Sequence, residues 1–507
     1  MTTHFELDIY SHYFTIKNPD LPSMDIIFKL SEDCTQRGYI RSGRDTVYGV
    51  VKIFNSVRID GTEYRYHISL LDKLRQYVLT ANFPVGSYKV TKHPVPEPTV
   101  INAPIREGWV PRDYQVPVIE YIKNSEKPTC FVGLGTGKGK SSIAMMAISQ
   151  LKMKTLILIK PTYMDKWSFD VSNILDVPKE RVNSIKGSTS LMELIELNLQ
   201  GKDQSDFIIM SLPTYHNYIC LYEKFGKDML ELGYGCLPED FLNVCGVGVV
   251  LMDEVHQLYH QQFQSMLYMN IHKLIALSAT FYTKDRSLEA MYELGIPIKD
   301  RYKETLDEKY IYVTAISYSF IKPEKIRYTE YNSNMYSQTA FEKSIMRHVP
   351  TKNHYLEMVS FQVEKAFIDR YKPGDKCLIF AGSINMCIEL RDKLRAEFPE
   401  LWIEKYTSED PYDYAMKPDI RVSTLGSFST GLDLPNLTTV IMTVNIDSIQ
   451  SSRQAIGRLR KIPDRDVYFY YLYCNQIDKH VRVHLSKRKT YSHIAKMFNE
   501  RHYPRSI

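Results

Sequence analysis

From residue 105 onward, short runs that are apolar throughout alternate with helical patterns. Clear examples of such runs are "TLILIKP" (155–161) and "VGVVLMDE" (247–254). Strands read in this way when helices cover both faces of a parallel sheet, because every side chain is then buried. This alternation of apolar runs and helical patterns stops over roughly 296–370 and begins again with "KCLIFAG" (376–382). We therefore expect two α/β domains in tandem, each built on a parallel sheet.

The remaining organisation follows from length and local composition. A chain of 507 residues is too long for one ordinary core, so two to four domains are expected. Residues 1–92 mix strand-like runs with one amphipathic helix, which predicts a small α+β accessory domain. Four prolines mark 93–104 as a stiff linker. The α/β domains then occupy 105–300 and 301–480, and 481–507 form a basic C-terminal tail.

Composition narrows the class of protein. The chain is 44% apolar and 24% charged with a net charge of +5, which is typical of a folded protein and permits a polyanionic partner without requiring one. Eight scattered cysteines disfavour a zinc site or a disulfide framework and favour a reducing compartment. The first thirty residues show no signal peptide, and the longest apolar stretch (244–252) is too short to span a bilayer. We expect a cytoplasmic protein with no membrane partner.

The stretch "FVGLGTGKGKSS" (131–142) lies between a strand run and a helix pattern, which is the context of a phosphate-binding loop. Gly139, Lys140 and Ser141 match the end of G-x-x-x-x-G-K-[ST], but Leu134 stands where the first glycine is expected. In such a loop, backbone N–H groups and the helix N-terminus face the phosphates. Lys140 would reach the β- and γ-phosphates and Ser141 would hold Mg²⁺. The alternative is a glycine-rich turn with a solvated lysine.

Asp253 and Glu254 end the run "VGVVLMDE". Carboxylates at the C-terminal end of a buried parallel strand lie where ligands bind in such sheets. Asp253 can orient Mg²⁺, and Glu254 can polarise the water that attacks a γ-phosphate. Ser278 and Thr280, at the end of "LIALSAT", could hydrogen-bond to the acidic strand and link nucleotide state to movement. A solvated strand end is the alternative for the acidic pair, and the S-A-T triplet is frequent, so alone it carries little information.

In their order along the chain, these segments resemble the motifs of superfamily 2 helicases and translocases of the DExH type. "RDYQ" (112–115) resembles the adenine-reading segment of that family, with Gln115 as the base contact. "KPTYMDKW" (160–167) and "SLPTY" (211–215) resemble segments that touch the nucleic-acid backbone. The resemblance implies two RecA-like motor domains that use ATP and Mg²⁺.

The resemblance continues in the second α/β block. "KCLIFAGS" (376–383) resembles the segment that opens the second motor domain, and "STLGSFSTGLDLPNL" (423–437) resembles its coupling motif. "QAIGRLRK" (454–461) resembles Q-x-x-G-R-x-x-R, which supplies arginine fingers. The motifs thus keep the order of the family over about 350 residues.

The resemblance implies a role for each matching residue. Catalytic roles are implied for Lys140, Asp253, Glu254, Gln454, Arg458 and Arg460, and Mg²⁺ ligation for Ser141 and Asp253. Nucleotide contacts are implied for Arg112, Gln115, Thr136, Gly137, Lys138, Gly139, Lys140, Ser141, Gly431 and Asp433, and coupling roles for His256, Ser278 and Thr280. Nucleic-acid contacts are implied for Pro161, Thr162, Trp167, Thr214, Ser383, Thr424, Ser429 and Thr430.

The arginine segment requires two domains to act together. Arg458 lies more than 300 residues from Lys140, so it can reach a γ-phosphate only if both domains clamp the nucleotide. A guanidinium there would stabilise charge that develops in phosphoryl transfer, and Gln454, one helical turn earlier, could position the attacking water. The last finger position falls on Lys461, whereas Arg460 sits one residue early. Because lysine lacks the guanidinium fork, we expect Arg458 to be the main finger.

The segment 423–437 is similar to that of phage recombination helicases of the UvsW kind, which are relatives of RecG. This resemblance implies branch migration, which includes moving Holliday junctions, regressing forks and dissolving R-loops. The partner would be branched or forked DNA in the host-cell cytoplasm, and the chain is compatible with a monomer. Residues 1–92 are a candidate DNA-binding domain through "QRGYIRSGR" (36–44), although a solvated loop is an equal alternative.

Three other functions stay open. A DExH RNA helicase shares the core motifs, and the motor subunit of a restriction or remodelling system would translocate on duplex DNA without unwinding it. A nucleic-acid-binding protein with a dead motor is the non-enzymatic alternative. The intact Lys140, Asp253, Glu254 and Arg458 argue against the last of these.

Overall fold

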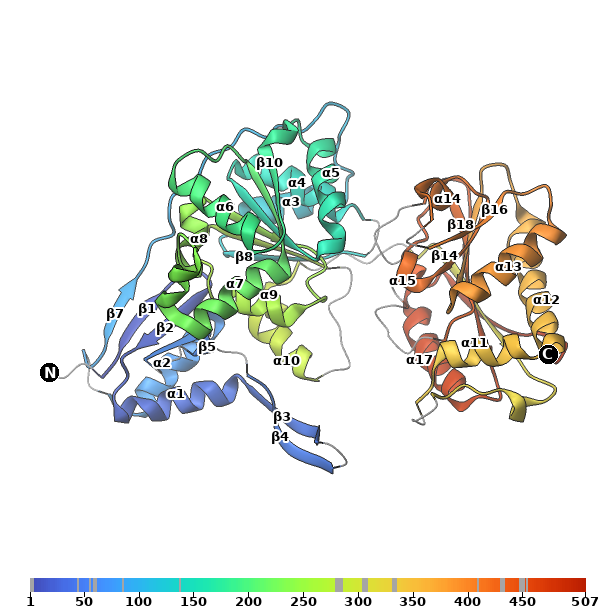
Figure 1. The fold of residues 1–507 in the computed structure, drawn as a ribbon, viewed down its shortest axis with the longest axis horizontal. Coiled ribbons are helices and arrows are strands. Elements are labelled where there is room, and N and C mark those ends of the chain that lie inside the picture. Colours follow the sequence, from blue (N-terminus) through green and yellow to red (C-terminus); the bar gives the residue numbers. More distant parts are fainter. Residues whose placement is uncertain are drawn as a thin grey trace. The chain divides into compact units, whose positions relative to one another are not determined.

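The computed structural model describes residues 4–42, 45–53, 56–57, 62–83, 86–135, 138–278, 286–302, 309–330, 335–407, 410–428, 434–445, 452 and 455–507. The chain divides into two compact units, Met1–Glu304 and Thr305–Ile507. Each unit contains a parallel sheet with helices on both faces (Figure 1). The predicted pair of α/β domains is therefore confirmed.

The large sheet of unit 1 has the strand order β10-β11-β9-β12-β13-β8, and every neighbouring pair is parallel. Its strands are β8 (Thr129–Gly133), β9 (Thr155–Ile159), β10 (Val182–Ile185), β11 (Phe207–Ser211), β12 (Val249–Met252) and β13 (Lys273–Ser278). The helices are α3 (Val116–Asn124), α4 (Lys140–Leu151), α5 (Met164–Ile174), α6 (Ser188–Leu199), α7 (Leu212–Phe225), α8 (Pro238–Val244), α9 (Tyr259–Met266) and α10 (Arg286–Gly295).

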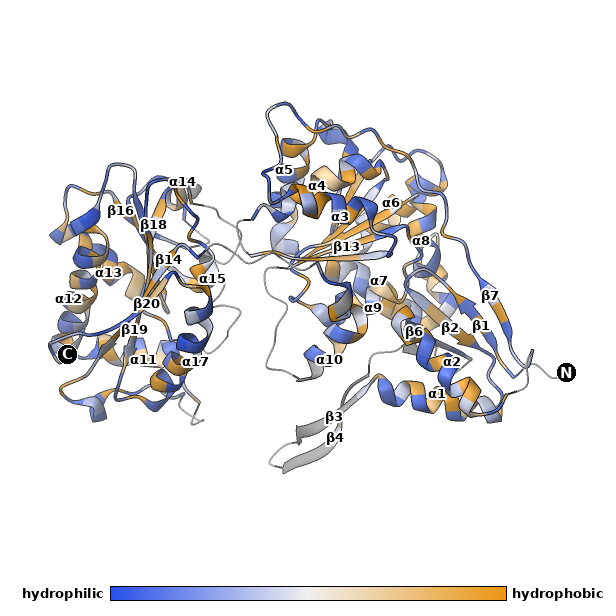
Figure 2. Cartoon of the chain, turned by 180° about the vertical axis from the view of Figure 1, so that it is seen from behind, coloured by the Kyte–Doolittle hydropathy of each residue, from blue (hydrophilic) through white to orange (hydrophobic). Residues whose placement is uncertain are grey.

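Alternate residues of these strands face two different cores. On β9, Ile157 packs with α3, α4 and α5, whereas Leu156 and Leu158 pack with residues of α6 to α9. Because both faces are covered, the strands are apolar at successive positions, as Figure 2 shows by their orange colour. This is the physical reason for the unbroken apolar runs in the sequence.

The N-terminal block forms a mixed sheet of order β5-β6-β2-β1-β7. Its strands are β1 (Glu6–Ile9), β2 (Tyr13–Lys17), β5 (Ser56–Val57), β6 (Glu63–His67) and β7 (Lys89–Lys92), with helices α1 (Leu21–Asp33) and α2 (Leu71–Thr80). Strands β3 (Thr35–Ser42) and β4 (Asp45–Ile53) form a separate antiparallel hairpin. Residues 36–42 of the predicted segment lie in β3, and residues 43–44 lie outside the described residues. The α+β class expected for this block is confirmed.

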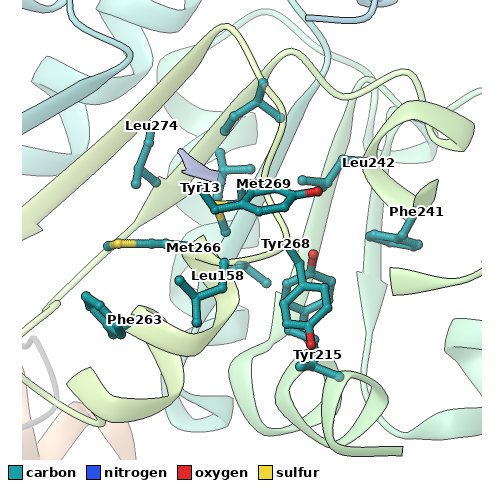
Figure 3. Packing of buried hydrophobic residues seen from close by; sticks show 14 of the residues in the cluster. Tyr13, Leu158, Tyr215, Phe241, Leu242, Phe263, Met266, Tyr268, Met269 and Leu274 are labelled. Atoms are coloured by element: carbon teal, nitrogen blue, oxygen red, sulfur yellow. The ribbon is translucent and has the colours of Figure 1, made fainter. Parts of the chain in front are cut away.

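This mixed sheet shares a core with the large sheet of unit 1. Tyr13 of β2 lies beside Met269 and Leu242 (Figure 3). The hydroxyl of Ser11 accepts a hydrogen bond from the Ile271 backbone N–H at 2.9 Å. Residues 1–92 therefore pack against the first α/β domain within one compact unit.

Arg65 of β6 is the buried charge at this junction. Its guanidinium pairs with Glu63 at 2.8 Å and with Glu239 of α8, and it lies 4.4 Å from the ring centre of Tyr268. Only 3% of the Arg65 side chain is exposed. A buried arginine needs such partners because an unpaired charge is costly in the protein interior.

Unit 2 is built on a parallel sheet of order β16-β17-β15-β18-β19-β14-β20. Its strands are β14 (Ile311–Tyr318), β15 (Lys376–Ala381), β16 (Ile403–Tyr406), β17 (Ile420–Thr424), β18 (Leu437–Met442), β19 (Val467–Cys474) and β20 (Met497–His502). The helices are α11 (Gln338–Arg347), α12 (Val349–Ala366), α13 (Ile384–Glu397), α14 (Tyr412–Met416), α15 (Leu425–Phe428) and α17 (Asp478–Ile494).

The segment 481–507, expected as a basic tail, is instead part of this second domain. Most of it forms α17 and β20, and β20 pairs in parallel with β14. Tyr491 of α17 is fully buried between Phe469 and Tyr471 of β19, which anchors the helix to the sheet. Because 481–507 is rich in basic residues, Tyr491 could not be recognised from the sequence as a core residue. In the described part of the chain, no helix combines the length and apolar character needed to cross a membrane.

Candidate active site

The predicted functional residues of unit 1 gather at the carboxyl edge of its large sheet. Because β8, β9, β11, β12 and β13 are all parallel, the loops that follow them meet at this edge. These loops and the helices after them carry Lys140 and Ser141 after β8, Pro161 and Thr162 after β9, Thr214 after β11, and Asp253 and Glu254 after β12; Ser278 is the last residue of β13.

The phosphate-loop sequence leads directly into α4, which begins at Lys140. Gly139 has φ +72°, and a Cβ atom there would lie 2.4 Å from Gln115 Nε2 and 2.7 Å from Ser142 Oγ, so glycine is strongly favoured. Leu134, in the place of the usual first glycine, is buried in the core, and its carbonyl oxygen accepts a hydrogen bond from Lys140 Nζ at 3.3 Å. Thr136 and Gly137 lie outside the described residues.

Residues 112–115, the segment expected to contact adenine, are hydrogen-bonded to this loop. Gln115 is buried, its Nε2 donates to the Lys138 carbonyl oxygen at 3.0 Å, and its Oε1 accepts from the Arg112 backbone N–H at 3.0 Å. The Tyr114 hydroxyl also donates to the Lys138 carbonyl oxygen, at 3.4 Å, and accepts from the Arg112 guanidinium at 3.1 Å. Sequence reasoning missed Tyr114, although its place inside the segment was the available signal.

Trp167 of α5 supports the acidic strand end. Its indole N–H donates to Asp253 Oδ2 at 3.1 Å, and the side chain is fully buried. Sequence reasoning expected Trp167 to contact nucleic acid, but burial removes the indole from the surface in this structure. The large apolar ring packs in the core while its N–H holds the carboxylate in place.

Ser141 and Asp253 meet the same turn of α5. Lys166 Nζ donates to Ser141 Oγ at 3.3 Å, and the adjacent Trp167 donates to Asp253. The Ser141 hydroxyl and the Asp253 carboxylate are hard oxygen ligands of the type that Mg²⁺ prefers. The residues present therefore fit Mg²⁺. Lys166 was missed by sequence reasoning, and its position next to Trp167 was the only signal.

Glu254, His256 and Ser278 lie close together, and His256 is hydrogen-bonded to Ser278. His256 Nδ1 lies 2.7 Å from Ser278 Oγ and 3.3 Å from Glu254 Oε2. Burial, with a smaller contribution from Lys140, lowers the pKa of His256 to about 3, so the imidazole is neutral at neutral pH. Glu254 has φ +48°, a left-handed conformation that costs about 1–2 kcal/mol for a residue with a side chain. This backbone turn redirects the chain directly after Asp253. Thr280 lies outside the described residues.

The remaining unit 1 predictions concern nucleic-acid contacts. Thr162 is exposed and Pro161 is half-buried, in the short turn Pro161–Tyr163 after β9. Thr214 is largely buried, and its hydroxyl accepts a hydrogen bond from the Gly187 backbone N–H at 2.8 Å. Of these residues, Thr162 is the most accessible.

Unit 2 holds the other predicted residues. Ser383 follows β15 and donates its hydroxyl hydrogen to Glu342 at 2.6 Å, and Thr424 ends β17 with its hydroxyl 2.8 Å from that of Ser427. The Arg460 guanidinium donates to the carbonyl oxygen of Gly457 and, at 3.4 Å, to that of Leu459. Arg458 is half-buried and Lys461 is exposed. Ser429, Thr430, Gly431, Asp433 and Gln454 lie outside the described residues.

The chain resembles known helicase-type proteins. Residues 109–283 match the family described as "Type III restriction enzyme, res subunit". A viral relative, 161L of Invertebrate iridescent virus 6, is provisionally named a helicase; it is 21% identical over 390 residues, which cover 73% of this chain and 77% of the viral protein.

Solved structures with a similar fold include proteins from three sources. The Pyrococcus furiosus Hef helicase domain is 14% identical and has a TM-score of 0.45, with 77% of this chain and 100% of that chain covered. The Saccharomyces cerevisiae Dbp5 bound to RNA and ADP BeF3 is 10% identical, with a TM-score of 0.48 and coverage of 77% and 90%. T4 UvsW is 13% identical, with a TM-score of 0.34 and 99% of each chain covered. These are distant likenesses in fold.

The family match and the ordered motifs confirm the resemblance to superfamily 2 helicases. Both support helicase-type ATPase activity, which implies ATP as the substrate and nucleic acid as a partner.

Proposed function

We propose that this protein is an ATP-dependent DNA helicase or translocase that remodels branched DNA. Its reactions would be Holliday-junction branch migration, fork regression and R-loop unwinding, in phage-type recombination, replication and repair. The observation that carries the ATPase part is the joined set of Trp167, Asp253, Glu254, His256 and Ser278 beside the phosphate loop. The choice of branched DNA is supported by the UvsW-like sequence of 423–437.

In this proposal, backbone N–H groups at the start of α4 bind the phosphates, and Lys140 contacts the β- and γ-phosphates. Mg²⁺, when bound, would neutralise phosphate charge, with Ser141 and Asp253 as its protein ligands. Glu254 orients the attacking water, and the neutral His256 connects Glu254 to Ser278 of β13. This connection supports a coupling role for His256, because a change at Glu254 would reach the next strand.

Arg458 is the proposed main arginine finger, and Arg460 is the weaker candidate. The guanidinium of Arg460 donates to backbone carbonyl groups of its own segment, which occupies part of its hydrogen-bonding capacity. Arg458 would act on the nucleotide bound by unit 1 after the units close. The positive guanidinium would then stabilise the charge of the transferring phosphoryl group.

A duplex-DNA translocase subunit of a restriction or remodelling system is the second candidate. The specific observation in its favour is the match of 109–283 to the type III restriction enzyme res subunit. The two candidates differ in substrate, because a duplex translocase needs no branch and separates no strands.

The test is ATP hydrolysis measured with single-stranded, duplex, forked and four-way DNA and with RNA. Stimulation that is strongest with forked or four-way DNA, together with strand displacement, is the expected result. Equal stimulation by unbranched duplex without displacement would favour the translocase, and stimulation by RNA alone would overturn the proposal. Lys140→Ala, which should hydrolyse no ATP, is the control for contaminating ATPases.

A further inference from the structure

A basic pocket lies on unit 2, at the carboxyl edge of its parallel sheet. It has a volume of about 230 Å³ and is lined by Lys343, Met346, Arg347, Ser383 and Asn385. Lys343, Met346 and Arg347 belong to α11, whereas Ser383 and Asn385 lie where β15 passes into α13. Ligands of parallel sheets bind at this edge, outside the carboxyl ends of the strands.

The two cations of the pocket form no ion pair with a described residue, and the nearby Glu342 carboxylate is fully buried and hydrogen-bonded to Gly382 and Ser383. Lys343 and Arg347 are exposed, stand one helical turn apart, and form no ion pair with a described residue. Like charges at this spacing repel each other by a few tenths of a kcal/mol in an isolated helix, so an anion between them is favourable. No acidic residue occurs from 343 to 356, and Glu389, one turn after Asn385, is already paired with Lys352 at 2.9 Å.

The walls of the pocket are held rigidly by a buried carboxylate. Glu342 of α11 is fully buried and accepts hydrogen bonds from the Gly382 N–H at 2.7 Å and the Ser383 hydroxyl at 2.6 Å. A Cβ atom on Gly382 would lie 2.5 Å from Gln338 Cγ, so α11 is packed tightly against this loop. The spacing between α11 and the start of α13 is therefore fixed before any ligand binds.

The hydrogen bond between Ser383 and Glu342 also determines which side chains can bind an anion. The Ser383 hydroxyl hydrogen is donated to Glu342, so it is not available to a phosphate oxygen. The amide of Asn385 is exposed and forms no hydrogen bond with a described residue, and it can donate alongside the two cations. Met346 supplies an apolar wall. One guanidinium, one ammonium and one amide around a small pocket match the oxygens of a phosphodiester.

We propose that this pocket, through Lys343, Arg347 and Asn385, binds a backbone phosphate of the DNA on which the protein acts. The inference rests on the proposed function for the identity of the strand, but the phosphate site itself is inferred from residues of unit 2 alone. Such a contact positions the strand without reading its sequence, because a phosphate carries no base information.

The test uses the full-length double variant Lys343→Ala/Arg347→Ala and a fluorescent forked DNA, with binding measured from about 50 to 200 mM salt. The pocket contacts one phosphate, and each phosphate contact contributes nearly one to the slope of log affinity against log salt, so the slope should become shallower by about one. We expect affinity to fall roughly ten-fold. ATP hydrolysis without DNA and the KM for ATP should not change, and circular dichroism should match that of the wild type.

The matched control is Lys322→Ala/Lys325→Ala. This pair removes the same charge from exposed positions of unit 2 outside the pocket, so it should leave most of the affinity intact. Equal affinity losses in both double variants would indicate a bulk charge effect and would overturn the proposal. An unchanged salt slope in Lys343→Ala/Arg347→Ala would overturn it as well. A raised KM for ATP without DNA would mean that the pocket binds free nucleotide and would also overturn it. A wild-type protein that binds no DNA would contradict the proposed function instead.

Discussion

At the scale of single residues, Trp167 gives the sharpest test of the active site. Trp167→Phe keeps an aromatic ring in the core but removes the N–H that donates to Asp253 at 3.1 Å. A hydrogen bond to a charged group contributes about 1.5–3 kcal/mol, so the turnover of ATP should fall roughly ten-fold or more. Steady-state hydrolysis at saturating ATP and Mg²⁺ measures this loss.

Trp402→Phe is the matched control for this change. Trp402 is 43% exposed in unit 2, and its N–H donates to Glu404 at 3.4 Å. The control should keep normal turnover. Normal turnover in Trp167→Phe as well would show that Asp253 does not need the indole.

Gly139 is a second residue at which geometry decides the outcome. In Gly139→Ala, the new methyl group would meet Gln115 Nε2 at 2.4 Å in a left-handed conformation that is unfavourable for alanine. We expect binding of a fluorescent ATP analogue to weaken roughly ten-fold or more, because the start of α4 must move. Titration of the analogue gives this affinity directly.

Gly135→Ala tests whether any loop glycine would give the same result. It lies in the same loop, but the nearest atom to its added Cβ would be Lys138 Cγ at 4.0 Å. This variant should bind nucleotide almost normally. If both variants bind alike, the tight contact between Gly139 and Gln115 is not needed for binding.

At the scale of elements, strands buried on both faces were the predictable part of the fold. Runs such as "TLILIKP" became β9 with every residue buried, since two cores require apolar side chains at successive positions. Edge strands were not predictable from this pattern. Strand β20 reads "MFNERH" and has no fully buried residue, so its pairing with β14 leaves little apolar signal.

The candidate site also has a part that could be predicted from the sequence and a part that could not. Lys140, Ser141, Asp253 and Glu254 were predictable, because each stands at a strand end or loop that has a local sequence pattern. The partners that hold them were not. Trp167 and Asp253 are 86 residues apart in sequence, and only the parallel order of β9 beside β12 brings them together.

At the scale of the whole molecule, Arg65 links the N-terminal sheet to the first α/β domain. Arg65→Met should lower the free energy of unfolding of unit 1 by about 3–5 kcal/mol, because it leaves the buried Glu63 without its partner. Chemical unfolding followed by fluorescence measures the change. Arg75→Met, which removes an exposed pair with Asp72, should cost less than about 1 kcal/mol. Similar losses in the two variants would refute a buried ionic link.

Acid sensitivity is a second property of the whole molecule. Burial lowers the pKa of His12, His256 and His480 to about 3 and that of His67 to about 4. These histidines resist protonation when folded but bind protons near their ordinary pKa of 6.5 when unfolded. Stability is therefore complete above about pH 6.5 and decreases as the pH falls towards about 4, by up to about 1.4 kcal/mol per pH unit for each histidine.

Unfolding midpoints between about pH 7.5 and pH 5 measure this dependence. His480→Gln should make the midpoint of unit 2 less dependent on pH, and His354→Gln, at an exposed position, should not. A wild-type midpoint that stays constant over this range would contradict the linkage to buried histidines.

The place of β14 between β19 and β20 has a consequence for synthesis on the ribosome. Of the described strands of unit 2, β14 is the first to leave the ribosome, yet both of its neighbours are made after all the others. Unit 1 can complete its contacts while unit 2 is still being translated, since domains generally fold as units from the N-terminus. Until residues 467–502 emerge, the edges of β14 stay unpaired, and this interval is when the nascent chain is most open to chaperones and to wrong strand pairing.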